Sequence, residues 1–444
     1  MTEKLAEYAV RDHWDSFTER DIRMASLSCA DWVAAAETGV PEGCVKALLS
    51  LAEDEGACGP FTLIGQKQTT SALYAALING TESHAIDFDD IHDFLSLHLC
   101  SPVFPAALAA AEYRAGTSGK LFLSGVMNGV QIMTALSAGM MPEHYNIGRW
   151  HATGTIGIFG AAAAAGLILG LSAEEMCQAY GICAGLMSGI QLNFGTMAKP
   201  MAAGMAAKNG LMAALLAKKG FTGRADIFDT DFPDNVSAKK VDGQAILERL
   251  SGPHAIHELR FKRYPCGAPT HSGIINCKKI LARHPHKIEE IERIVFEPYP
   301  RAIRLVGNMD PKTGLQGKFS IAFTAAAQIV FGEVTIDTFV DEKVKDPRVQ
   351  YLLKRMELVP DDTFTASRGG RATMYFTDGT SDSNETYLLG HELDLDEAES
   401  DVSGKFMEIM KPAAGEVKAK ELYEAVMSLS EAESIENFRE LLRG

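Results

Sequence analysis

Residues 150–171 read WHATGTIGIFGAAAAAGLILGL, a stretch without formal charge apart from a possible charge on His151. Its length would satisfy a membrane-spanning helix. However, it is built mainly from Ala and Gly, contains Thr153 and Thr155, and lacks flanking Lys/Arg clusters or an aromatic belt. A second nearly uncharged span, 178–198, has the same small-residue texture. Helices that are apolar on every face of an acidic chain indicate central core helices, so we expect no membrane partner.

Helical patterns extend outward from this core up to about residue 223. In each of them, apolar residues recur at three- and four-residue spacing and the pattern ends near Gly. The segments that show this pattern most clearly are 71–88, 101–116, 119–139 and 208–223. Gly181, Gly185 and Gly189 recur at every fourth residue, which on a helix would form a smooth stripe for close backbone packing.

After about Lys262 the sequence pattern changes from helical only to a mixture of strands and helices. Residues 291–299 alternate like a strand, with Ile291, Val295 and Phe296 as apolar members, and 371–389 read as a hairpin with its turn at Asp378–Gly379. Two helical patterns, 318–332 and 346–356, lie between them, and the chain returns to helix after about residue 403.

These patterns predict a mainly α fold of two domains, as suits a chain of 444 residues. We expect a large all-helical domain over 1–261, onto which residues 397–444 pack back. We expect a smaller inserted α+β domain over 262–396.

The charge and cysteine content narrow the classes of function. A net charge of −16 argues against a nucleic-acid surface, which needs exposed Lys and Arg to neutralise phosphates. The eight cysteines form no CxxC pair and no zinc spacing, and the first residues contain no signal segment. We therefore expect a cytoplasmic protein with reduced thiols.

The stretch HAIDFDDIHDFLSLH, residues 84–98, is the main candidate for chemistry. It concentrates four carboxylates and three imidazoles, namely Asp87, Asp89, Asp90, Asp93, His84, His92 and His98. Such a cluster can bind a hard cation, can polarise a histidine into a general base, or can be a solvated helix end. The apolar residues 101–111 follow directly, which weakens the last of these interpretations.

Isolated cations occur in three further motifs. Arg149 and His151 would lie at the start of a buried helix, where free backbone N–H groups favour an anion, although a capping segment explains them equally well. Lys199 stands in an otherwise uncharged run, and a buried lysine needs a partner or a lowered pKa. Lys262 and His271 flank the expected domain boundary, where hinge or surface roles are common.

Carboxylates beside histidines, with isolated cations nearby, suit proton abstraction next to a carboxylate. The dianionic intermediate of that step needs fixed positive charge and hydrogen-bond donors. The chemistry requires no metal ion and no cofactor, and the sequence contains no P-loop, no dinucleotide-binding GxGxxG after a strand and no GxSxG elbow.

Several of these motifs together resemble the MmgE/PrpD family. The segments that carry the resemblance are HAIDFDDIH, HLCSPVFPAALAAAE, WHATGTIGIFGAAAAAGLILGL, NFGTMAKPMAAGMAAKNGLMAALLAKKGFTG and MDPKTGLQGKFSI. The resemblance covers nearly the whole chain. It implies a helical domain, a smaller α+β lid domain, a homodimer, and metal-free, cofactor-free chemistry on a small di- or tricarboxylate in an interdomain cleft.

The resemblance also assigns residues. The family's catalytic positions match Asp87, His98, His151, Lys199 and Lys262. We expect His98 or His151 to be the base, oriented by Asp87. We expect Lys199, Arg149 and Lys262 to bind the substrate's carboxylates and stabilise the enolate. We expect Asp89 and His271 to be further substrate-binding residues.

The chain departs from the family pattern at four positions. Ile91, Ala202, Gly267 and Phe323 stand where members of the family carry Thr, His, His and Tyr, respectively. Each change removes a donor or an acid–base group, which counts against decarboxylation in particular. We therefore expect a lyase of the dehydratase type, with an epimerase that shares the first step, or a non-catalytic polycarboxylate-binding relic, as the alternatives.

Overall fold

The computed structural model describes residues 1–92, 95, 97–283, 285, 287–364, 369–387 and 393–444. The chain folds into two compact units. The first contains residues 1–193, 197–261 and 393–444, and the second contains residues 194–196 and 262–392. Helices make up 63% of the structure and strands 8%, which confirms the prediction of a mainly α fold.

The first unit is helical apart from two-residue strands. Its helices are α1 (Thr2–Val10), α2 (Glu19–Gly39), α3 (Gly43–Asp54), α4 (Ala72–His84), α5 (Cys100–Tyr113), α6 (Gly119–Met140), α7 (Glu143–Asn146), α8 (Ala152–Thr155), α9 (Gly157–Leu169), α10 (Ala173–Leu186), α11 (Ala198–Lys218), α12 (Phe232–Ser237), α13 (Gly243–Leu250), α20 (Leu395–Ala414), α21 (Glu416–Met427) and α22 (Glu436–Leu442). Its strands are β1 (Phe61–Thr62), β2 (Thr69–Thr70), β3 (Ile91–His92) and β4 (Leu259–Arg260), paired β1 with β2 and β3 with β4.

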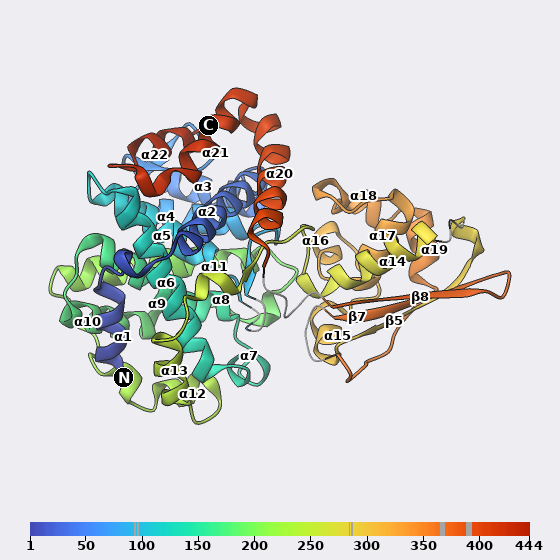
Figure 1. Cartoon of the computed structure of the whole chain (residues 1–444), viewed down its shortest axis with the longest axis horizontal. Coiled ribbons are helices and arrows are strands. Elements are labelled where there is room, and N and C mark those ends of the chain that lie inside the picture. The colour runs from blue at the N-terminus through green and yellow to red at the C-terminus, as the bar shows by residue number, and fades with distance from the viewer. Residues whose placement is uncertain (93–94, 96, 284, 286, 365–368, 388–392) are drawn as a thin grey trace. The chain divides into compact units, whose positions relative to one another are not determined.

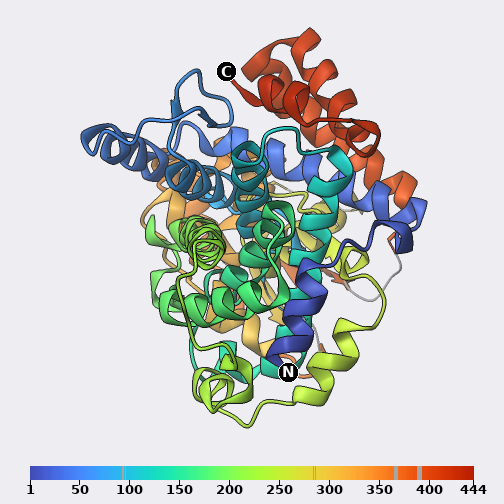
Figure 2. The same ribbon diagram turned by 90° about the vertical axis from the view of Figure 1, so that its left-hand side faces the viewer.

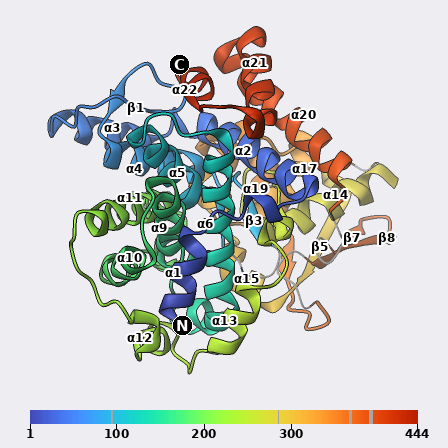
Figure 3. The ribbon, with the colours of Figure 1, turned by 60° about the vertical axis from the view of Figure 1, so that its left-hand side comes forward.

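Helix α9 is the centre of this unit. All of its residues are buried, and it packs against α5, α6 and α11 (Figure 3). It ends at Gly170, whose φ of 71° suits glycine because glycine has no Cβ to clash. Two helical stretches, 119–140 and 152–169, are long and apolar enough to cross a membrane, but 89% and 100% of their most apolar windows are buried within the protein. Both belong to the core of the helical unit, as expected for 150–171.

The expected core helix over 178–198 is wrong. Helix α10 ends at Leu186, and α11 begins only at Ala198. Gly189 has a φ of 117°, which no helix accommodates, and Leu192 is 86% exposed. The absence of charge in this segment therefore does not mean that the segment is buried. The expected glycine stripe is interrupted at Gly189, and the segment reaches the surface.

The C-terminal helices pack on the N-terminal part of the chain. Helices α20 and α21, red in Figures 1 and 2, lie beside α2. On the surface, Arg23 of α2 forms ion pairs with Asp396 at 2.8 Å and with Glu399, both on α20. The first unit is thus built from both ends of the chain.

The second unit is a four-stranded sheet with helices. Its elements are α14 (His271–Arg283), β5 (Ile291–Pro298), α15 (Pro300–Val306), α16 (Gly314–Gly317), α17 (Ile321–Phe331), α18 (Asp341–Val344), α19 (Pro347–Leu353), β6 (Met356–Leu358), β7 (Gly370–Phe376) and β8 (Ser381–Thr386). The strand order is β6-β5-β7-β8; β5 and β6 are parallel and the other pairs antiparallel.

The expected hairpin is β7–β8, with Gly379 at a φ of 86° in its turn. Residues 388 and 389, which end the expected hairpin segment, lie outside the described residues. In β5 an irregularity between Ile291 and Arg293 shifts the alternation, so that Ile294 and Phe296 are fully buried and Val295 is not.

Candidate active site

The acidic stretch forms a loop between α4 and β3 in the first unit. Asp87, Phe88, Asp89 and Asp90 begin three residues after the end of α4 and are all buried. Asp87 has a φ of 61°, a left-handed conformation that costs a residue other than glycine free energy. Such a conformation persists only where the surroundings hold it. Asp93, which the sequence groups with these carboxylates, lies outside the described residues.

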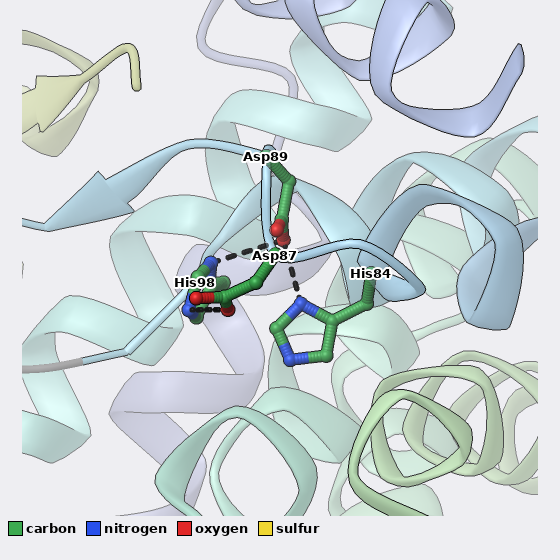
Figure 4. Close-up of side chains that lie close together, drawn as sticks. All are labelled: His84, Asp87, Asp89 and His98. Atoms are coloured by element: carbon green, nitrogen blue, oxygen red, sulfur yellow. Dashed lines mark hydrogen bonds and ion pairs between the residues drawn. The ribbon is translucent and has the colours of Figure 1, made fainter. Parts of the chain in front are cut away.

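Asp89 holds two imidazoles in place. Its Oδ2 lies 2.9 Å from Nδ1 of His84 and 3.0 Å from Nδ1 of His98, and it accepts a hydrogen bond from Oγ of Ser101 (Figure 4). Because an ionised carboxylate only accepts hydrogen bonds, His84 presents a protonated Nδ1 to it. For His98, which lies between Asp89 and Asp87, the short contact with Asp89 favours a proton on Nδ1, and a general base would need its lone pair on Nε2.

The pKa values of Asp89, His84 and Asp90 are shifted by burial and by the charges of neighbouring residues. Burial favours a higher pKa for Asp89, but the charges of His84 and His98 and the hydrogen bonds from them hold its pKa well below its usual range. Burial lowers the pKa of His84 to about 3, more than Asp89 raises it, so that His84 is neutral near pH 7. Burial, together with the negative charge of Asp89, raises the pKa of Asp90 to about 7.

Asp87 connects this group with Lys199. Its Oδ1 lies 3.6 Å from Nε2 of His98 and accepts a hydrogen bond from the ammonium of Lys199. Lys199 stands in the first turn of α11, and its side chain is 5% exposed. The structure therefore supplies the partner that a buried lysine needs, and it brings His98, Asp87 and Lys199 together as expected.

His151 lies beside His84. Its ring stacks on that of His84 with 5.5 Å between the ring centroids. Burial, and then electrostatic interactions with His84, Lys199 and His98, hold the pKa of His151 well below its usual range. The same segment carries Thr153, whose hydroxyl accepts a hydrogen bond of 3.1 Å from the backbone N–H of His98.

The exposure of Arg149 differs from the prediction, whereas His151 lies at the start of a buried helical stretch as expected. His151 is the N-cap of α8, and only Ile156, in an αR conformation, separates this single turn from α9. Arg149 is exposed, with a φ of 59°, and its carbonyl accepts from the backbone N–H of Gln191. Among the described residues, Arg149 takes no part in the hydrogen bonds that join His84, Asp89, Ser101, Asp87 and Lys199.

Lys262 and His271 belong to the second unit and are described there. Lys262 begins the main segment of this unit and is 2% exposed. His271 begins α14, and its ring meets that of Tyr264 edge-on at 5.2 Å.

The chain can be assigned to a family by comparison with known proteins. The model of the MmgE/PrpD N-terminal domain matches residues 3–235, and the model of the MmgE/PrpD C-terminal domain matches residues 264–431. The chain belongs to the MmgE/PrpD family. The match to the C-terminal domain of the family includes α20, although α20 folds as part of the first unit of the structure.

Curated relatives span most of the chain. A cis-aconitate decarboxylase-like protein of Aspergillus oryzae is 24% identical over 418 residues, 88% of this chain and 86% of the relative. A cis-aconitate decarboxylase of Aspergillus terreus is 26% identical over 479 residues, 97% and 94% of the two chains. A mitochondrial 2-methylcitrate dehydratase of Yarrowia lipolytica is 26% identical over 311 residues, 64% and 58% of the two chains.

The departures from the MmgE/PrpD pattern lie in close-packed places. A Cβ added at Gly154 or at Gly189 would lie 3.2 Å from Cβ of Ala202, so Ala202 packs close to the backbone of both glycines. A side chain at Gly267 would meet Val306 at 3.2 Å. Phe323 is fully buried in the core of the second unit.

The cluster also contains a donor set that could bind a metal ion. One ligand atom each from His84, Asp87, Asp89 and His98 lies within 4.8 Å of the others. However, the Lys199 ammonium already bonds to Asp87, and both Nδ1 atoms face one oxygen of Asp89. An ammonium beside the carboxylates neutralises the charge that would attract a second cation, so the residues fit an acid–base site better.

Two residues of the cluster, His84 and Ser101, are not predicted as site residues from the sequence. His84 lies in the stretch 84–98, but its spacing does not distinguish it from an ordinary core histidine. Ser101 follows His98 by three residues and opens α5, a position that alone gives no signal.

Proposed function

We propose that this MmgE/PrpD protein is a cofactor-independent lyase that removes a proton α to a carboxylate of a small di- or tricarboxylate, with loss of a β-hydroxyl as water. The names of its relatives, a decarboxylase and a dehydratase of polycarboxylates, support this class of chemistry. A decarboxylase would instead release a carboxylate of the substrate as carbon dioxide, leaving the bonding electrons on the substrate carbon to be protonated, and an epimerase would return the proton to the opposite face.

The observation that carries the proposal is the position of His98 between two carboxylates. Nδ1 faces Asp89 at 3.0 Å, and Nε2 faces Asp87 at 3.6 Å. An imidazole held in this way has its basic nitrogen defined before substrate arrives. When Nε2 takes up a proton, both neighbouring carboxylates stabilise the imidazolium.

The proposed reaction then has two steps. Nε2 of His98 takes the α-hydrogen as a proton, and the electrons of the C–H bond pass into an enolate. The Lys199 ammonium stabilises the developing negative charge. The enolate electrons form the new double bond as the β-hydroxyl leaves, and the imidazolium returns its proton to that hydroxyl so that water departs.

We assign the base to His98 rather than to His151, because the His98 ring lies between Asp89 and Asp87. His151 has its pKa held well below its usual range, so it binds a proton weakly. A neutral His151 can instead donate or accept a hydrogen bond next to the reacting group. We assign Asp89 to positioning rather than to substrate binding, because it is fully buried, hydrogen-bonded to His84 and Ser101, and 3.0 Å from Nδ1 of His98.

The remaining expectations complete the proposal. Lys262, His271 and Arg149 would bind carboxylates of the substrate. The protein would act as a cytoplasmic homodimer, whose assembly analytical ultracentrifugation measures directly.

The test is incubation with 2-methylcitrate, citrate, cis-aconitate and malate in deuterated water, followed by proton NMR. The proposal expects loss of an α-hydrogen signal and appearance of an unsaturated product without loss of carbon dioxide. Exchange with inversion and no elimination would contradict the lyase in favour of the epimerase. Binding without exchange would contradict both and leave the polycarboxylate-binding relic.

A further inference from the structure

The loop from Asp87 to Asp90 is held at every residue by a different part of the first unit. Asp87 receives Lys199 from α11 and Asp89 receives the histidines and Ser101. The carboxylate of Asp90 accepts the backbone N–H groups of Leu99 and Cys100 at the start of α5, each at 3.0 Å.

Phe88 is held by the C-terminal tail. The ammonium of Lys405 on α20 donates a hydrogen bond of 2.5 Å to the backbone carbonyl of Phe88 and lies 3.8 Å from the centroid of its ring. The same ammonium forms an ion pair with Asp31 of α2 at 2.7 Å. The Lys405 side chain is 9% exposed and that of Asp31 is 0% exposed, so water screens these contacts little.

We propose that Lys405 is a positioning residue, which fixes the loop that carries Asp87 and Asp89 in its reactive geometry. The inference rests on the proposed function in so far as it concerns the rate of reaction. The Lys405 ammonium makes three contacts: a hydrogen bond to the Phe88 carbonyl, a cation–π contact with the Phe88 ring and an ion pair with Asp31. Two of the three contacts are with Phe88, the residue that follows Asp87. They act where the chain adopts a left-handed φ, a conformation that needs such external support.

The proposal separates the role of Lys405 from the general packing of α20. Arg23 is a matched control because it is also a cation that joins α2 and α20, through Glu399 and Asp396, but it does not touch the loop. Phe406 is a second control, since its fully buried ring packs α20 against Tyr423 of α21 at 5.3 Å between centroids.

The primary experiment measures backbone amide hydrogen exchange of peptides covering residues 85–92 by mass spectrometry. In Lys405→Met these amides should exchange about tenfold faster than in the wild type, as expected when a hydrogen bond to a charged group is lost. In Arg23→Met and Phe406→Leu the loop should keep its wild-type protection, and Lys405→Arg should restore most of it. Unchanged loop exchange in Lys405→Met, or equal acceleration in Phe406→Leu, would overturn the proposal.

The second readout is the steady-state reaction on the substrate that the NMR panel identifies. Lys405→Met should lower kcat while KM changes little, because Lys405 supports the reacting groups and does not bind substrate, and Lys405→Arg should recover kcat. An equal loss of kcat in Arg23→Met would overturn the assignment. If the wild type exchanges no α-hydrogen on any polycarboxylate, the proposed function fails, whereas the amide exchange still decides the role of Lys405.

Discussion

Nδ1 of His98 lies 3.0 Å from Oδ2 of Asp89, and both side chains are buried. Under the proposed function, this carboxylate favours the ring tautomer of His98 that carries its proton on Nδ1. The neighbouring His84 contacts the same oxygen at 2.9 Å, so one carboxylate orients two imidazoles. In an acid–base site this is the contact that makes Nε2 of His98 the basic atom.

The first prediction concerns this carboxylate. Asp89→Asn can present an N–H group to Nδ1, which favours the tautomer with its proton on Nε2 and removes the base. We expect the rate of α-hydrogen exchange to fall roughly a thousandfold or more. Exchange within tenfold of the wild type, in a protein with normal circular dichroism, would show that Asp89 does not set the tautomer.

A second prediction separates catalysis from stability at Lys199. Lys199→Met leaves the buried Asp87 without this partner, so the free energy of unfolding should fall by about 3–5 kcal/mol. Adding Asp87→Asn removes the uncompensated charge and should restore part of that stability in urea denaturation, but no activity. Recovery of exchange in the double variant would contradict a catalytic role for Lys199.

The third prediction is a pH dependence of stability. His84 has a pKa of about 3 in the fold, whereas an unfolded histidine takes up a proton below its ordinary value of 6.5. The unfolded state therefore binds more protons in this range, and stability falls as pH falls from 6.5 towards 3. Between pH 6 and pH 5 the wild type should lose about 1 kcal/mol more than His84→Gln. Parallel pH profiles of the two proteins would contradict a neutral His84.

A fourth prediction concerns metal ions. We expect the protein to retain its exchange activity after dialysis against EDTA, with less than one equivalent of any transition metal by plasma mass spectrometry. Loss of activity on chelation, with recovery on adding back one metal, would instead assign the His84, Asp87, Asp89 and His98 cluster to that ion.

The fifth prediction tests the packing that brings α4 and α11 together. A Cβ at Gly204 of α11 would lie 2.2 Å from the carbonyl oxygen of Leu77 on α4, so Gly204→Ala should destabilise the protein by about 1–3 kcal/mol. Gly185→Ala is the matched control, because a Cβ there meets nothing within 4 Å. Equal unfolding temperatures for the two variants would contradict close packing at Gly204.

Much of the fold could be predicted because it depends on local periodicity. The patterns over 101–116 and 119–139 correspond to α5 and α6, whose apolar residues recur at helical spacing and whose ends are marked by glycine or by Ser118 as N-cap. The break between α10 and α11 could not be predicted in this way. Absence of charge indicates low polarity but does not determine whether a segment is covered by other elements.

The candidate site was partly predictable for the same reason. Asp87, Asp89 and His98 lie within one stretch, so their chemistry is visible in the sequence. Lys199 joins Asp87 only through the packing of α11 on α4. Lys405 lies 317 residues from Phe88 and appears in the sequence as an ordinary helical lysine. Contacts of this range depend on tertiary structure, which no local pattern reports.

The most direct test of the central claim compares deuterium incorporation at the α-carbon of the substrate by wild type, His98→Gln and His144→Gln. His144 is a buried histidine outside the cluster, bonded to the carbonyl of Val236 and the hydroxyl of Thr155. We predict that His98→Gln abolishes incorporation while His144→Gln retains it. Wild-type incorporation in His98→Gln would contradict the assignment of His98 as the base.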